Sequence, residues 1–129
     1  MQFSTPLRNA RANLIESMIG PSPVLDIFDT AAPANTTDPD PGTLLCSMNL
    51  PSTWESTATT GSIALAGTWS GVAVATGAPL SFRIKDSSAV VWAQGTCSIG
   101  AGGDLVFDGS IYTGQTVVVD TFGITEGNA

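Results

Sequence analysis

The stretch PLSFRIKDSSAVVWAQGTCSI, residues 79–99, decides the fold class. Its first part, residues 79–85, alternates strictly between apolar and polar side chains, as a strand with one buried face does. The apolar face would hold Leu80, Phe82 and Ile84, and the face exposed to water would hold Ser81, Arg83 and Lys85. DSS at 86–88 predicts a hairpin turn, and residues 89–99 predict the returning strand.

Similar short runs of apolar, β-branched and small residues predict the other strands. They lie at 24–29, 43–50, 63–69, 71–76, 104–108 and 115–125. GAGGD at 100–104 predicts a second hairpin turn, because Gly and Asp tolerate positive φ. About eight short strands predict a mainly β protein, an antiparallel β-sandwich or a jelly-roll-like barrel. The length of 129 residues suits a single domain, 1–129, with the sandwich at 24–125.

Ahead of the strands, residues 1–20 predict one N-terminal α-helix. Thr5 is the expected N-cap, Pro6 occupies the first helical position, and Gly20 followed by Pro21 ends the helix. Residues at helical spacing form an apolar stripe of Leu7, Ala10, Leu14, Ile15 and Met18. The polar remainder consists of Arg8, Asn9, Arg11, Asn13, Glu16 and Ser17. We expect the stripe to be buried, either against its own sheet or against another subunit.

Two further segments are candidates for contact with a partner. Residues 30–42, TAAPANTTDPDPG, predict a surface loop of unusual length, and such loops are commonly functional or lie on a partner. Asp38 and Asp40 lie in this loop. Tryptophans in a small β domain are more often core or subunit-contact anchors than ligand platforms. A carbohydrate platform would need one tryptophan exposed on a rim, and Trp54, in STWEST, is the one to test for it.

The charge composition argues against several classes of partner. The net charge is −7, with only four lysines and arginines, so no basic patch for nucleic acid or for an anionic membrane can be assembled. Charged residues make up 12% of the chain, about half the usual share, which suits a surface packed against neighbours. The N-terminus lacks the pattern of a secretory signal and no run of apolar residues could span a bilayer, so we expect folding in a cytoplasm.

The residues offer little for chemistry. The chain has no histidine, which removes the commonest general base and zinc ligand. Cys46 and Cys97 are expected to be buried free thiols rather than a disulfide. The pairs Asp104 with Asp108 and Asp38 with Asp40 could in principle act as acid and base, but turn chemistry already explains all four. We expect no catalytic residue, no cofactor and no metal.

Five segments together carry a resemblance. They are FSTPLRNARANLIESMIG at 3–20, SPVLDIF at 22–28, TAAPAN at 30–35, GTLLCSMNLPSTW at 42–54 and TVVVDTFGITEGNA at 116–129. They resemble a small protein that recurs in the structural gene clusters of tailed bacteriophages. The resemblance implies a location in the virion, after assembly in the cytoplasm of the host bacterium, and it brings no catalytic residue with it.

Two structural roles fit a compact β domain of this kind. The favoured one is a capsid decoration, or cement, protein, which would bind the major capsid protein and copies of itself, with a trimer favoured over a dimer. The alternative is a small tail, baseplate or receptor-binding fibre component. A virion-associated glycan hydrolase using Asp104 or Asp108 is the weakest hypothesis. The candidate interface residues are Leu7, Arg8, Arg11, Leu14, Met18, Asp38, Asp40 and Trp54.

Overall fold

The computed structural model describes residues 1–126 and is mainly β, with one helix at its N-terminus. This confirms the mainly β prediction and the single helix. The helix is α1 (Thr5–Ile19). The strands of the described part are β1 (Val24–Phe28), β2 (Leu44–Asn49), β3 (Ser62–Ala64), β4 (Trp69–Val72), β5 (Ser81–Lys85), β6 (Val91–Ile99), β7 (Leu105–Phe107), β8 (Thr116–Val119) and β9 (Gly123–Thr125).

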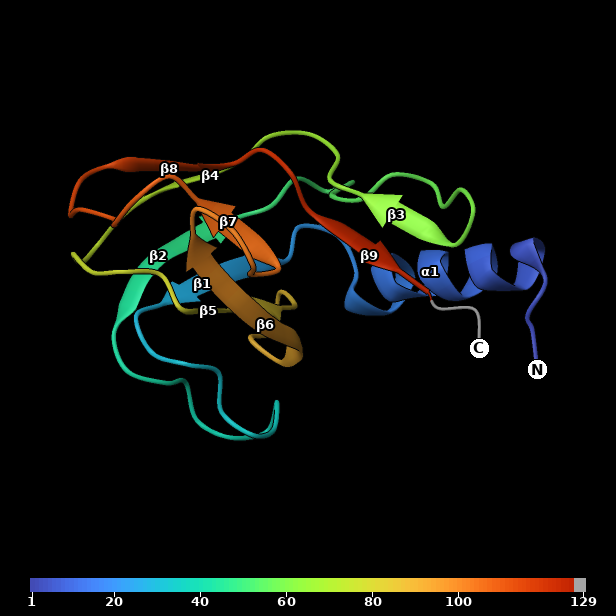
Figure 1. Cartoon of the computed structure of the whole chain (residues 1–129), viewed down its shortest axis with the longest axis horizontal. Coiled ribbons are helices and arrows are strands. Elements are labelled where there is room, and N and C mark those ends of the chain that lie inside the picture. Colours follow the sequence, from blue (N-terminus) through green and yellow to red (C-terminus); the bar gives the residue numbers. More distant parts are fainter. Residues whose placement is uncertain (127–129) are drawn as a thin grey trace.

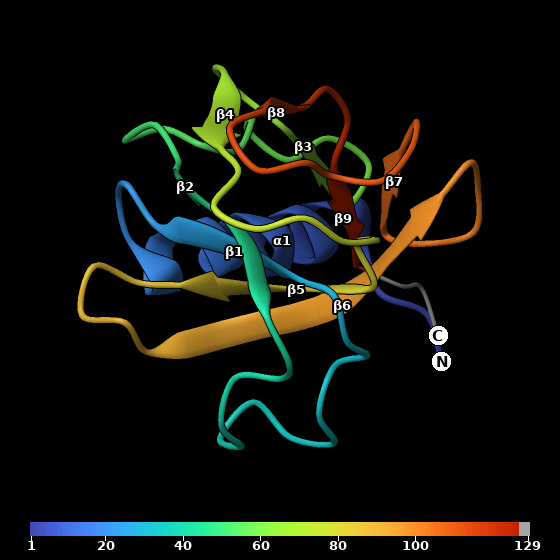
Figure 2. The same cartoon turned by 90° about the vertical axis from the view of Figure 1, so that its left-hand side faces the viewer.

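The strands form one five-stranded sheet and two short ribbons. The sheet has the order β2-β1-β5-β6-β7, and the ribbons pair β4 with β8 and β3 with β9. An isolated bridge between Cys46 and Ala73, next to a hydrogen bond from Val74 N to Leu45 O (2.8 Å), joins β4 to β2. Figure 2 shows the strands curling from β5 and β6 on one side, past β7, to β8 and β4 on the other.

Aromatic side chains fill the space between the five-stranded sheet and the β4–β8 ribbon. Trp69, at the start of β4, lies 5.2 Å from the ring of Phe122, and Phe122 meets Phe82 of β5 edge to face at 5.8 Å. Trp54 extends the cluster, 6.1 Å from Trp69. All four rings are at least 91% buried, so this cluster forms the core of the molecule.

The predicted hairpin around residues 86–88 is confirmed, whereas the one at 100–104 is wrong. β5 and β6 are antiparallel, and the Asp86 carboxylate accepts hydrogen bonds from the Ser88 and Val90 N–H groups. In contrast, β7 runs parallel to β6. The cause is Asp104, whose carboxylate accepts hydrogen bonds from Thr96 N (3.0 Å) and Thr96 Oγ1 (3.2 Å), because these bonds draw the start of β7 back beside the middle of β6.

The predicted strands 63–69 and 115–125 are each split in two. The first gives β3 and the start of β4, and the second gives β8 and β9. At the break Leu65 N donates to Phe122 O (2.9 Å), so the two segments bend away from the core together. One half of each segment lies over the large sheet as β4–β8, and the other forms the β3–β9 ribbon that lies along α1 (Figure 1).

The prediction of a wet face on residues 79–85 is wrong. Ser81 and Arg83 are 0% and 1% exposed, whereas Leu80 is 46% exposed. The reason is the loop at 30–42, which covers this face: Ser81 Oγ donates to Thr30 O (2.6 Å) and Arg83 Nη1 donates to Asp38 O (2.8 Å). The loop therefore lies on its own sheet.

Candidate interaction surface

The helix α1 begins and ends close to the predicted positions. Ser4, not Thr5, is the N-cap, since Ser4 Oγ accepts a hydrogen bond from Leu7 N (3.3 Å) and Thr5 is already helical. Gly20 ends the helix at φ 88°, and its N–H donates to Glu16 O (2.9 Å). These capping contacts fix the residues at which α1 begins and ends.

The helix packs onto its own chain with a face that carries both apolar and asparagine side chains. Ala12 and Ile19 are buried, and Ala12 packs with Ala58 and Ile63. Two asparagines beside them act as acceptors: Asn9 Oδ1 for Gly61 N (2.7 Å) and Asn13 Oδ1 for Ala58 N (2.8 Å). These asparagines, assigned to the polar remainder on the sequence, in fact satisfy backbone N–H groups of the segment that enters β3.

Ile15 of the predicted apolar stripe packs against the core, but three other members of the stripe point outward. Leu7, Leu14 and Met18 are 46%, 55% and 55% exposed. Together with Arg11 they recur at spacings of four, three and four residues, so they share one side of the helix. Leu7, Leu14 and Met18 are therefore not buried against their own sheet. Their contact with another subunit stays a prediction.

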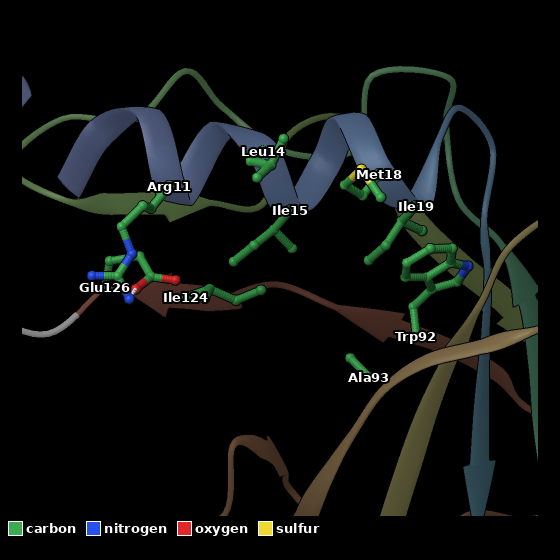
Figure 3. A pocket seen from close by; sticks show the side chains of 9 residues that line it. All are labelled: Arg11, Leu14, Ile15, Met18, Ile19, Trp92, Ala93, Ile124 and Glu126. Atoms are coloured by element: carbon green, nitrogen blue, oxygen red, sulfur yellow. Dashed lines mark ion pairs between the residues drawn. The ribbon is translucent and has the colours of Figure 1, made fainter. Parts of the chain in front are cut away.

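Beside this stripe lies an apolar groove of about 480 Å³. Figure 3 shows Ile15 and Ile19 of α1 pointing toward Ile124 of β9 and Trp92 of β6, and Leu14 and Met18, which also line the groove, lie on the helix beside them. The sequence did not single out Trp92 as a surface residue, because the small residues of strand 89–99 hide which face is buried. Its side chain is 42% exposed, and its Nε1 donates to Asp86 Oδ2 (2.9 Å). We call the exposed stripe and this groove together the α1 surface.

Arg8 and Arg11 both contact Glu126, which directly follows β9. Arg8 Nε donates to the Glu126 backbone oxygen (3.1 Å), and Arg11 forms an ion pair with the Glu126 carboxylate (2.9 Å) at the rim of the groove (Figure 3). Arg11 also lies over the Phe3 ring at 5.1 Å from its centroid. Both arginines have partners within the chain, and their contact with an acidic neighbour stays a prediction.

Trp54 is a core residue, so it is exposed neither as a carbohydrate platform nor as a candidate interface residue. It is 0% exposed, and its Nε1 donates to Gly20 O (3.1 Å) at the end of α1. Backbone pairing holds the segment around Trp54 in place: Glu55 and Leu65 form an isolated β-bridge, and Ala66 N donates to Trp54 O (3.0 Å). Trp54 therefore fixes the C-terminal end of α1 to the aromatic core.

Asp40 and Asp38 attach the loop at 30–42 to the sheet. The Asp40 carboxylate pairs with Lys85 (2.7 Å) and with the buried Arg83 (3.1 Å). Burial works against ionisation of Asp40, but the hydrogen bonds and positive charges of Lys85 and Arg83 outweigh it and lower its pKa. The Asp38 carboxylate accepts a hydrogen bond from Asn35 N (2.9 Å). These contacts order the loop, and a clamp between subunits stays a prediction.

Glu55 is the titratable group that the sequence did not single out. It is 1% exposed, and neither carboxylate oxygen has a hydrogen-bond partner within residues 1–126. Burial raises its pKa to about 8, and the negative charge of Glu16 on α1 adds to the shift. The protonated, neutral form of Glu55 therefore predominates at neutral pH in the folded protein. The segment STWEST has the composition of a loop, and this composition does not indicate that the Glu55 side chain is buried.

The remaining candidates for chemistry are dispersed. Asp104 is engaged by Thr96, whereas Asp108 lines a second groove, of about 430 Å³, between β7 and β8. No group of three or more His, Cys, Asp or Glu residues in the described part could hold a metal ion. Cys46 and Cys97 are buried and free, as predicted, and burial raises the pKa of Cys97 to about 12.

Comparison with known proteins gives no relative for this chain. No family model matches it, and neither the curated proteins nor the solved structures contain a match. Among the described residues, no helix is long and apolar enough to cross a membrane. The fold and the geometry define the chain as a mainly β domain whose N-terminal helix presents an apolar surface.

Proposed function

We propose that the chain is a non-enzymatic structural protein of a bacteriophage virion, specifically a capsid decoration, or cement, protein. It would bind the outside of the shell, contact the major capsid protein and copies of itself, and stabilise the particle through these contacts. A ligand that binds only the assembled shell stabilises that state by mass action, so no chemical step is needed. The resemblance of residues 3–54 and 116–129 to a phage virion protein motivates the location.

The observation that carries the proposal is the α1 surface. Leu7, Leu14 and Met18 are about half exposed on one side of the helix, and Trp92 stands across the groove from Met18. Clustered exposed apolar side chains are typical of sites where another molecule binds. Polar contacts of Asn9 and Asn13 with the chain hold the helix in this orientation.

The finer description of the fold belongs with this proposal. We infer that the curled five-stranded sheet and the β4–β8 ribbon are the two layers of an open sandwich of the jelly-roll type. The bridge between Cys46 and Ala73 that joins β2 to β4 supports this, as does the shared aromatic core around Trp69 and Phe122. A rigid sandwich is a suitable base for a clamp, because it fixes the direction in which α1 faces.

Counting copies in purified virions tests the proposal. A decoration protein should be present in hundreds of copies, and gold labels should lie on the head. A few copies at the tail tip would instead support the tail or receptor-binding alternative. Absence from the particle would exclude both.

Substitution on the α1 surface tests the mechanism more directly. Removing residues 1–20 would uncover Ala58 and Ile63, so we prefer to change exposed residues only. The double variant Leu14→Glu with Met18→Glu should lose binding to shells stripped of the protein. The matched control is Val118→Glu on β8, where the side chain is 48% exposed and does not line the groove. Equal shell binding by both variants would contradict a role for the α1 surface.

A further inference from the structure

The α1 surface is also suited to contact with itself. Leu7, Arg11, Leu14 and Met18 form a seam along the helix, and Ala10 and Ser17, both exposed, lie beside it. Small residues next to larger apolar ones let two helices approach closely and interlock their side chains. In an antiparallel pair related by a two-fold axis, Leu7 of one helix faces Met18 of the other, and Arg11 faces Leu14.

The most exposed of the cationic side chains, that of Arg11 at 44%, lies on this helix. Of the four lysines and arginines, Arg83 is 1% exposed and the Lys85 side chain is 13% exposed. Arg8 and Arg11 remain, both in the N-terminal half of α1. With a net charge of −7, two copies repel each other over most of their surface. The single carboxylate of Glu126 offsets only one of these two arginines, so the arginine half of α1 keeps a net positive charge that can attract a carboxylate of a second copy.

Negative charge lies around the other half of the same helix. The Asp86 carboxylate holds the Trp92 indole N–H (2.9 Å) at the groove wall near Met18. Antiparallel pairing sets the arginine half of one copy against the Asp86 carboxylate of the other, and it also opposes the two helix dipoles. Parallel pairing would set the arginines of both copies side by side.

Arg11 can enter such a contact without leaving an unpaired charge. Its guanidinium already pairs with the Glu126 carboxylate of its own chain (2.9 Å) and lies over the Phe3 ring. A buried ion that keeps its partner avoids most of the cost of an isolated buried charge. Arg11 in the middle of the seam is therefore compatible with burial.

From the self-complementary seam and this distribution of charge, we propose that the α1 surface binds a second copy of the chain, with the two α1 helices antiparallel about a two-fold axis. The proposal rests on the same surface as the proposed virion role, but it replaces the trimer expected from the sequence by a dimer. A helix of 15 residues is about 22 Å long, and a contact of that length is smaller than a standard interface. The dimer should consequently be weak in solution and should weaken further in high salt.

Analytical ultracentrifugation of the purified full chain, up to about 200 µM, tests the pairing. The wild type should form dimers in a concentration-dependent way, and Leu14→Glu should raise the dissociation constant at least about tenfold. Val118→Glu, with a similar exposed fraction of 48% against 55%, is the matched control and should leave it unchanged. Circular dichroism confirms that both variants are folded. A protein that stays monomeric throughout, or a dimer insensitive to Leu14→Glu, would overturn the proposal.

Cross-linking tests the antiparallel direction. Cys46 and Cys97 are 0% and 4% exposed, so a cysteine placed at Ala10 or Ser17 is the reactive thiol. At 1.5 Å per residue, the two Ala10 positions of the pair lie about 8 Å apart along the axis and the two Ser17 positions about 14 Å. A short bismaleimide should therefore trap Ala10→Cys much faster than Ser17→Cys. Equal trapping, or a trimer, would refute the antiparallel pair.

These measurements use no shells and no virions. A monomer in solution that is still found in hundreds of copies per virion would end the α1 pairing and leave the decoration role in place. A dimer trapped as described, in a protein absent from virions, would end the decoration role and leave the α1 pairing in place.

Discussion

The buried carboxyl of Glu55 should make the stability of the protein fall as the pH rises from 5 to 8. Its pKa is raised from an ordinary value of 4.5 to about 8, first by burial and then by Glu16. Below pH 4.5 Glu55 is protonated in the folded and the unfolded chain. Between pH 4.5 and 8 only the folded chain keeps the proton, so each step upward in pH favours unfolding, and the stabilisation is lost as the pH passes 8.

The size of the effect follows from the two pKa values. The difference between 4.5 and about 8, at about 1.36 kcal/mol for each pH unit, gives an upper limit of about 5 kcal/mol. That is a large part of the stability of an ordinary domain. Glu55→Gln keeps the shape and removes the proton, so the variant should match the wild type at pH 5 and exceed its stability progressively towards pH 8.

Urea unfolding between pH 5 and 8, followed by the fluorescence of the buried Trp54 and Trp69, measures the effect. The window is clean, because the chain has no histidine and the carboxyl pKa values of Asp29, Asp40 and Asp86 are lowered. Asp120→Asn, at an exposed position, is the matched control and should keep the wild-type profile. If Glu55→Gln and the wild type differ by the same amount, within about 0.5 kcal/mol, at every pH, the reasoning about Glu55 is refuted.

Two further predictions concern buried groups. Arg83→Met should lower the free energy of unfolding by about 2–4 kcal/mol, because the Asp38 carbonyl oxygen and the Asp40 carboxylate lose the Arg83 guanidinium as a donor. The same variant should open residues 30–42 to proteinase K. Arg11→Met, which breaks a partly exposed ion pair, should cost about 1 kcal/mol or less in the same urea titration, and equal costs would contradict the anchoring role of Arg83. Cys46 and Cys97 should not react with a thiol reagent in the folded protein and should both react in urea, so fast labelling of native protein would contradict their burial.

Periodicity predicted the secondary structure well where one face of an element meets the core. The helix at the N-terminus, the strands β1, β2 and β5 and the turn after Lys85 could all be predicted in this way. The direction of β7 could not, because it depends on hydrogen bonds between Asp104 and Thr96, eight residues apart in the sequence. The breaks at Leu65 and Phe122 were equally hidden, since they exist only because the two segments pair.

Burial of polar residues escaped prediction for a related reason. Arg83 alternates with apolar neighbours exactly as an exposed residue would, and only the return of a distant loop covers it. The residues around Trp54 show no periodic pattern that would indicate burial. Trp54 lies in the core because of its contacts with Gly20 and Trp69, which periodicity does not reveal. Of the eight candidate interface residues, the structure brings Leu7, Arg11, Leu14 and Met18 together on α1, places Arg8 beside them, and removes Trp54 from the surface.

The orientation of α1 can be understood from the energies of its contacts. Turning the helix to bury Leu7, Leu14 and Met18 would deprive Ala58 N and Gly61 N of their asparagine acceptors, at about 1–3 kcal/mol for each buried N–H left unpaired.

The same turn would also withdraw Ala12 and Ile19 from their contacts. The gain would be roughly half of the 1.5–3 kcal/mol that full burial of each stripe side chain provides, because each is already about half covered. The lost hydrogen bonds and the lost burial of Ala12 and Ile19 together outweigh this gain, so α1 keeps its observed orientation. The free energy of covering Leu7, Leu14 and Met18 is consequently released only when another molecule covers them, as the proposed assembly role requires.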